Sequence, residues 1–282
     1  MRKRIVFTVE KHRVLVPVGM PCPFGCRYCY TRGRDVRISR DTPEEILSDF
    51  QQFARETTTP FETVQFGYDS DPFSRPERGL PMLKQLAQMR KHINFSTKAL
   101  LEGPILEELS EINRYMLAAG TTLSALISLS CWDSAQAVEP HTPTPAERVR
   151  TIANLKRIGV PVFIAVRPIL PHIPDSEYER LAEEGVRAGC DGFILGPLYA
   201  DAAKKFVRFI PPAVLATVPG KTGSVSWSPH QPVWTRYEDP QRLQRLLTMI
   251  ENKGGRTFLS SADAMDRVAQ REQVASGAPC FS

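Results

Sequence analysis

Short apolar runs alternate with amphipathic helical stretches along roughly the first 200 residues of the chain. The apolar runs predict strands at 13–18, 62–67, 93–97, 122–130, 160–166 and 191–196. The amphipathic stretches predict helices at 42–56, 79–91, 104–118, 145–158 and 175–188. A helix that connects two strands is long enough to bring the second strand back parallel to the first. The alternation therefore predicts about six strand–helix units built on a parallel sheet.

The number of units indicates an incomplete barrel. A complete barrel of eight units takes about 250 residues, whereas the six units of this chain end near residue 200. We therefore expect the α/β class, and within it a partial (β/α)6 barrel of the TIM type that occupies residues 1–210. The tail is rich in proline and tryptophan and predicts a helix at 239–252, a short strand and a further helix. We expect residues 211–282 to form a C-terminal accessory segment packed on this core.

The composition indicates a protein of the cytoplasm. Hydrophobic residues make up 42% of the chain and charged residues 24%, the balance of an ordinary globular protein. The start lacks the continuous apolar segment of a signal peptide, and no apolar run approaches the roughly 20 residues that span a bilayer. Six cysteines in a chain of this length do not indicate a disulfide framework. We therefore expect a reducing environment, no membrane partner, and thiols that bind metal or do chemistry.

The formal net charge of +5 is mildly basic and partly concentrated in one stretch. Five arginines lie close together in the sequence: Arg27, Arg32, Arg34, Arg37 and Arg40. Such a stretch is either a solvated face or a flap that contacts an anionic partner. Nucleic acid is therefore a possible partner that the sequence leaves open.

Three of the six cysteines follow the first predicted strand with the spacing C-x₃-C-x₂-C: Cys22, Cys26 and Cys29. A structural zinc site needs four ligands, usually from two pairs, and the next cysteine along the chain is Cys131. A redox pair would leave Cys22 without a role. Three thiolates are also able to hold three irons of a 4Fe–4S cluster and leave the fourth iron open. The spacing favours the cluster, with zinc and redox chemistry as alternatives.

This motif, with the aromatic Tyr28 before its third cysteine, resembles the signature of the radical S-adenosylmethionine (radical SAM) superfamily. The resemblance implies that Cys22, Cys26 and Cys29 bind a 4Fe–4S cluster, that S-adenosylmethionine binds the open iron, and that Tyr28 lies beside its adenosyl group. It implies that an electron from the cluster cleaves the cofactor to a 5′-deoxyadenosyl radical. A flavodoxin or ferredoxin type of reducing partner would supply that electron.

Further segments resemble the radical SAM subgroup related to spore photoproduct lyase. They are FGYDSDPFSRPE at 66–77, STKALL at 96–101, the segment SLSCWDSAQAVEPHTPTPAERV and VRPILPHIPDSE. The resemblance implies that six of their residues contact the cofactor: Ser70, Asp71, Lys98, Ser128, Glu139 and Arg167. It gives Arg148 a supporting role. Simpler roles stay open, such as a turn cap for Asp71 and a strand-end surface position for Lys98.

Three residues are candidates for catalysis. Tyr30 follows the motif and either relays a hydrogen atom or only covers the cluster. Asp69 occupies the position at which spore photoproduct lyase has a hydrogen-donating cysteine, so it is expected to act as a polar anchor or proton acceptor for a different reaction. Cys131 and the near-terminal Cys280 are candidate replacements for that thiol, with a buried core thiol and a tail thiol as their simpler interpretations.

These observations together predict a radical SAM enzyme of lyase or transferase type. Its radical would abstract hydrogen from, or add to, a small-molecule or nucleotide substrate. One alternative is repair of a DNA lesion in the manner of spore photoproduct lyase, or modification of nucleic acid. The other is a metal-binding module without catalysis.

Overall fold

The computed structural model of the chain describes residues 5–33, 42–225 and 233–276. Its main sheet has eight strands in the order β1-β2-β3-β4-β5-β6-β7-β11. The strands are β1 (Val9–Glu10), β2 (Arg13–Val16), β3 (Thr63–Phe66), β4 (His92–Thr97), β5 (Leu123–Ser128), β6 (Val162–Val166), β7 (Gly192–Leu195) and β11 (Thr257–Phe258). Strands β2 to β7 pair in parallel, each with the next along the chain. The predicted partial barrel is confirmed.

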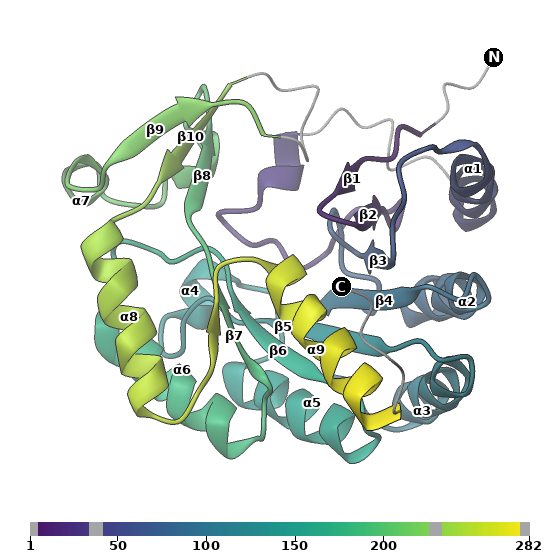
Figure 1. Cartoon of the computed structure of the whole chain (residues 1–282). Coiled ribbons are helices and arrows are strands. Elements are labelled where there is room, and N and C mark those ends of the chain that lie inside the picture. The colour runs from purple at the N-terminus through teal and green to yellow at the C-terminus, as the bar shows by residue number, and fades with distance from the viewer. Residues whose placement is uncertain (1–4, 34–41, 226–232, 277–282) are drawn as a thin grey trace.

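Helices connect the strands and cover the convex side of the curled sheet (Figure 1). They are α1 (Pro43–Glu56), α2 (Pro76–Ala87), α3 (Pro104–Ala118), α5 (Pro145–Arg157) and α6 (Asp175–Arg187), with the short α4 (Ala135–Val138) between β5 and α5. Helix α1 begins where the sequence predicts, because Thr42 and Glu45 form a reciprocal capping box. Helix α2 begins at Pro76, three residues before the predicted start at 79, because proline is well suited to the first turn of a helix.

The two faces of the sheet are covered by different helices. Side chains such as Ile127 and Ile164 are fully buried against the connecting helices. Their neighbours Leu126 and Phe163 point to the other face and pack in a separate cluster with Met265 of α9 (Ser261–Ser276). Figure 1 shows α9 crossing the sheet over β5, β6 and β7. Strands that are apolar on both faces are therefore buried on both, as parallel strands require.

A second, antiparallel sheet lies above one end of the barrel (Figure 1). Its order is β8-β10-β9, with β8 (Leu198–Asp201), β9 (Gly220–Gly223) and β10 (Trp234–Tyr237). The 3-10 turn η3 (Lys205–Val207), α7 (Pro212–Ala216) and α8 (Pro240–Asn252) complete this part of the chain. The sheet takes one strand from before residue 210 and two from after it. The division of the chain at residue 210 stays a prediction. Among the described residues, no helix is long and apolar enough to cross a membrane.

Candidate active site

The cysteine motif lies in the loop that follows β2, at the carboxyl edge of the parallel sheet, where functional groups of such folds gather. Gly25 turns the loop with φ +67°, which glycine adopts without steric cost. The Arg27 N–H donates to the Val138 carbonyl at 2.9 Å. The His141 N–H donates to the Phe24 carbonyl at 3.3 Å. The connection between β5 and α5 therefore holds the loop in place.

Of the three thiols in the loop, Cys26 is buried, and Cys22 and Cys29 are half-buried. Burial is the main cause that raises the pKa of Cys22 to about 11 and that of Cys26 to about 12, and the neighbouring thiols contribute to both values. Such thiols stay protonated near neutral pH unless a metal compensates the charge of the thiolate. Among the described residues, no three His, Cys, Asp or Glu side chains are grouped to hold a single metal ion. A cluster of several irons has different requirements, because each of several irons is held by a separate thiolate. Binding of such a cluster by these three cysteines stays a prediction.

A buried ion pair lies next to the cysteine loop. Arg148 Nη1 donates to Glu139 Oε2 at 2.6 Å, and neither side chain is exposed. The same nitrogen donates to the Ser128 carbonyl at 2.9 Å. The Tyr28 hydroxyl donates to Glu139 Oε1 and lies 2.8 Å from Ser130 Oγ. Burial, and then the charge of Glu139, raise the pKa of Tyr28 well above its ordinary value. The aromatic residue of the motif is therefore fixed to the end of β5.

Lys98, which follows β4, brings an ammonium group to the same place. Its Nζ donates to Ser128 Oγ, lies 3.6 Å from Glu139 Oε1 and lies 5.8 Å from the centre of the Tyr28 ring. Its side chain is 13% exposed. Burial lowers the pKa of Lys98, but the negative groups around it, Glu139 first among them, together outweigh burial, so the pKa is raised and the amine is charged. The structure thus brings Tyr28, Lys98, Ser128 and Glu139 together, and their contact with a cofactor stays a prediction.

Asp71, by contrast, has the geometry of a turn cap. Its Oδ1 accepts hydrogen bonds from the N–H groups of Phe73 at 3.0 Å and Ser74 at 3.1 Å. The Thr97 hydroxyl donates to the same oxygen at 2.8 Å, and the Lys98 N–H donates to Oδ2 at 2.6 Å. Both oxygens are therefore engaged in joining the turn after β3 to the end of β4. A cofactor contact from Asp71 stays a prediction.

The residues around Asp71 connect the turn after β3 to the cysteine loop. The Val18 N–H donates to Asp69 Oδ1 at 3.0 Å. Tyr30 begins the 3-10 turn η1 (Tyr30–Gly33), and its hydroxyl donates to the Tyr68 carbonyl. The buried hydroxyl of Ser70 has no hydrogen-bond partner among the described residues, so it is available to a ligand. The catalytic roles of Asp69 and Tyr30 stay predictions.

Cys131 is a buried thiol, as its simpler interpretation expects, and Arg167 is engaged by the segment that precedes α9. The Cys131 side chain is fully buried, and burial raises the pKa of its thiol far above the ordinary value. Arg167 Nη2 donates to the Leu259 carbonyl at 2.5 Å, at the start of the connection to α9. Its side chain crosses Gly196, where a Cβ atom would lie 2.7 Å from Arg167 Nε. Burial lowers the pKa of Arg167 to about 10. Their roles in chemistry and cofactor binding stay predictions.

Two hydroxyl residues of this region were not predicted. Thr97 donates to Asp71, and Ser130 contacts Tyr28. Ser130 lies two positions after Ser128, a spacing that places residues on one face of an extended chain, so the sequence does carry a signal for it. Thr97 carries no such signal, because it is next to Lys98 in the chain, and neighbouring residues of a strand point to opposite faces. Of the other candidates, Cys280 and the arginines at 34, 37 and 40 lie outside the described residues.

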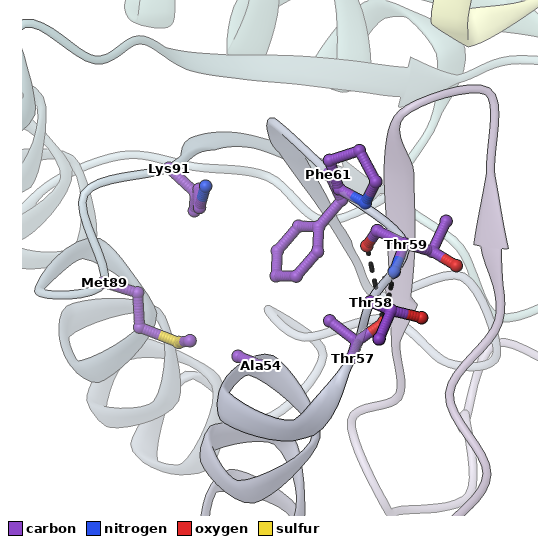
Figure 2. Close-up of a pocket in the computed structure, with 8 residues that line it drawn as sticks. Ala54, Thr57, Thr58, Thr59, Phe61, Met89 and Lys91 are labelled. Atoms are coloured by element: carbon purple, nitrogen blue, oxygen red, sulfur yellow. Dashed lines mark hydrogen bonds between the residues drawn. The ribbon is translucent and has the colours of Figure 1, made fainter.

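A pocket of about 420 Å³ at the opposite edge of the sheet does not contribute to this site. Figure 2 shows it between the end of α1 and the loops that precede β3 and β4. Its threonines bond to each other, with the Thr59 N–H donating to Thr57 Oγ1 at 3.2 Å. Lys91 lies over the Phe61 ring at 5.1 Å. These loops lie at the amino ends of the strands, away from the cysteine loop.

Comparison with known proteins identifies the family. The sequence model of the radical SAM superfamily matches residues 16–185, more than half of the chain. The chain belongs to the radical SAM superfamily. Membership in this superfamily implies an enzyme, a 4Fe–4S cluster and S-adenosylmethionine.

Curated relatives of this radical SAM protein include uncharacterized proteins of Mycobacterium tuberculosis and Mycobacterium bovis. Each is 25% identical over 189 residues, which is 61% of this chain and 54% of the relative. The chain therefore spans about half the length of the curated relatives it matches.

Solved structures of the same fold include a spore photoproduct lyase variant with bound S-adenosylmethionine and dinucleoside spore photoproduct. It has a TM-score of 0.64 and 15% identity, and the match covers 88% of this chain and 76% of the lyase. Another is SuiB of Streptococcus suis bound to its precursor peptide SuiA, with a TM-score of 0.51, 15% identity, and coverage of 66% and 39%. At these identities the likeness shows the shared fold alone.

Proposed function

We propose that this radical SAM protein binds a 4Fe–4S cluster through Cys22, Cys26 and Cys29. We further propose that it abstracts hydrogen from, or adds a radical to, a small-molecule or nucleotide substrate. When bound, the cluster and S-adenosylmethionine supply a 5′-deoxyadenosyl radical. The main support is the cysteine loop, which places buried thiols at the carboxyl edge of a parallel sheet beside a charged amine. A donor of the flavodoxin or ferredoxin type would be the reducing partner.

Lys98 is suited to hold the carboxylate of S-adenosylmethionine. Its Nζ lies 3.6 Å from Glu139, whereas the oxygens of Glu139 already accept hydrogen bonds from Arg148 and Tyr28. Lys98 would therefore leave no unpaired buried carboxylate behind if it turned toward a second anion. The unpartnered hydroxyl of Ser70 offers a further hydrogen bond to a bound ligand. Glu139 and Arg148 would act as the fixed support for these groups.

Repair of a nucleic-acid lesion, or modification of nucleic acid, is a second candidate. The observation that favours it is the fold shared with a spore photoproduct lyase that has dinucleoside spore photoproduct bound. Asp69 counts against it, because a carboxylate does not donate a hydrogen atom as a thiol does. Its Oδ1 is also engaged by the Val18 N–H. A small molecule or nucleotide is therefore the favoured substrate class.

Formation of 5′-deoxyadenosine tests the proposal. The protein is reconstituted anaerobically with iron and sulfide, reduced, and supplied with S-adenosylmethionine. We expect 5′-deoxyadenosine from the unaltered chain and only background amounts from Cys26→Ala, because two thiolates hold the cluster poorly. The matched control is Cys190→Ala, which removes a thiol outside the motif and should retain the product. An unaltered, iron-loaded protein that forms no 5′-deoxyadenosine would contradict the proposal.

Binding to DNA separates the two candidates. A protein that contacts several phosphates binds duplex or single-stranded DNA at low salt and loses affinity steeply as salt increases. For a small-molecule enzyme, we expect weak binding with no dependence on a lesion. Fluorescence anisotropy with intact and lesion-bearing oligonucleotides measures both quantities. Tight, lesion-selective binding would favour the second candidate instead.

A further inference from the structure

A second pocket of about 510 Å³ lies in the C-terminal part of the chain, between η3, α7 and the end of β10. Val207, Ile210 and Tyr237 are buried residues of its lining, each at most 8% exposed. Leu215 and Val218 are half-buried and add further apolar surface. In Figure 1 this region lies beside α7, at the edge of the small sheet. The volume and the apolar lining are those of small-molecule sites in proteins.

Two exposed cations line the same pocket. Lys204 and Arg208 have no ion-pair partner among the residues that the structure describes. The nearest acidic residues in the sequence are engaged elsewhere. The Glu238 carboxylate pairs with Arg236 at 2.7 Å, and Asp201 Oδ1 caps the backbone of η3 at 2.6 Å. Residues 202–225 contain no Asp or Glu. The pocket therefore carries positive charge that the surrounding chain does not neutralise.

The backbone of one of these cations has an unusual conformation. Lys204 has φ +54°, in the left-handed region that residues other than glycine rarely adopt. Its N–H donates to the Asp201 carbonyl at 2.8 Å, which holds this conformation at the end of β8. Unfavourable backbone conformations are often retained where they direct a side chain toward a ligand. The backbone of Lys204 is thus held at the rim of the pocket, from which its side chain starts.

We propose that this pocket binds a small ligand with an apolar body and one anionic group, such as an aromatic or short acyl carboxylate. The apolar body would lie on Val207, Ile210 and Tyr237, where it is removed from water. The carboxylate would lie between Lys204 and Arg208 and neutralise their charge. No residue of the candidate active site lines this pocket. The site is therefore independent of the radical chemistry and of the substrate proposed above.

A pair of matched probes tests whether the pocket binds the apolar body and whether it recognises the anionic group. Calorimetric titration of the full chain compares 1-naphthaleneacetate with the uncharged 1-naphthaleneacetamide, which has the same ring. We expect one saturable site for the acid and about fivefold or more weaker binding of the amide, because partly exposed charge pairs contribute modestly. The variant with Lys204→Glu and Arg208→Glu should bind the acid no better than the amide. Ala216→Trp, which fills the pocket from an exposed position, should weaken both probes.

Lys221→Glu is the control, because it reverses one positive charge on β9 outside the pocket, as each substitution of the double variant does inside it. It should leave the preference for the acid intact. Melting temperatures equal to that of the unaltered chain show that each variant is folded. The proposal is overturned if the unaltered chain shows no saturable site, if acid and amide bind equally, or if Lys221→Glu weakens the acid as much as the double variant does.

Discussion

Glu139 is the residue around which the polar groups of the candidate site are organised. It accepts hydrogen bonds from Arg148 and Tyr28 and lies 3.6 Å from Lys98, with no exposed surface of its own. A buried ion pair of this kind adds little to stability by itself, but removing one partner leaves a buried charge unpaired. Its principal effect is to hold a tyrosine and a lysine in fixed positions beside the cysteine loop.

We predict that Glu139→Gln lowers the free energy of unfolding by about 3–5 kcal/mol, because the Arg148 guanidinium remains buried without its carboxylate. Chemical denaturation measures the change. The control is Asp133→Asn, which breaks the exposed pair with Arg180 and should cost about 1 kcal/mol or less. A loss from Glu139→Gln as small as that of the control would contradict the buried pair.

The charge of Glu139 makes the stability of the fold depend on pH. Glu139→Gln keeps the shape of the side chain and removes the charge, so it shows how much of this dependence comes from the charge. Burial raises the pKa of Glu139, but the charges of Arg148 and Lys98 outweigh it and lower the pKa below the ordinary 4.5. A lowered folded-state pKa stabilises the protein above the unfolded value, and this stability is lost as the pH falls through the folded value. Between about pH 6 and pH 3, the unaltered chain should therefore lose more stability than Glu139→Gln does. Equal losses would contradict the lowered pKa.

Single residues differed in how well the sequence predicted them. Lys98 and Ser128 meet because they follow and end the adjacent strands β4 and β5, and that order is readable from the apolar runs. Tyr28 and Glu139 lie in the connections after β2 and β5, at the same edge of the sheet. For Asp71 the sequence left a turn cap and a cofactor contact open, and it did not show that both carboxylate oxygens accept hydrogen bonds from backbone and hydroxyl donors. Hydrogen-bond geometry within a turn depends on backbone angles, which the order of the residues does not show.

Among the elements, α9 connects the end of the chain to the centre of the barrel. Met265 packs with Leu126 and Phe163 on the concave face, and its sulfur lies 2.9 Å from Ser124 Oγ. Leu259 lies just before α9, and its carbonyl accepts a hydrogen bond from the Arg167 guanidinium. The sequence predicted a helix here but not its location, because an amphipathic pattern shows that a helix has an apolar face and not which surface covers it.

We predict that Met265→Ala lowers the free energy of unfolding by about 2–5 kcal/mol, as for other buried methionines truncated in cores. Leu117→Ala is the control, because Leu117 is 47% exposed on α3 and should cost about 0.5 kcal/mol or less. Denaturant titration of both variants gives the comparison. Equal stabilities would show that α9 does not hold the concave face.

The whole molecule combines a barrel that carries the cysteine loop with a C-terminal part. That part adds strands to both sheets and a helix, α9, to one face of the main sheet. The alternation of strands and helices was sufficient to predict the six parallel strands from β2 to β7, because each connection allows only one sense of pairing. The tail could not be placed in this way. Its strand β11 pairs with β7, and its strands β9 and β10 join β8. These long-range pairings have no local signal in the sequence.

Electron paramagnetic resonance of the anaerobically reconstituted and reduced protein, with and without S-adenosylmethionine, tests the central claim most directly. We predict about four irons per chain and a cluster signal that changes when S-adenosylmethionine is added, because the open iron gains ligands. Cys22→Ala should lose the signal, and Cys190→Ala should keep it. A reconstituted chain that holds zinc in place of iron, or a cluster signal that S-adenosylmethionine leaves unchanged, would contradict the claim.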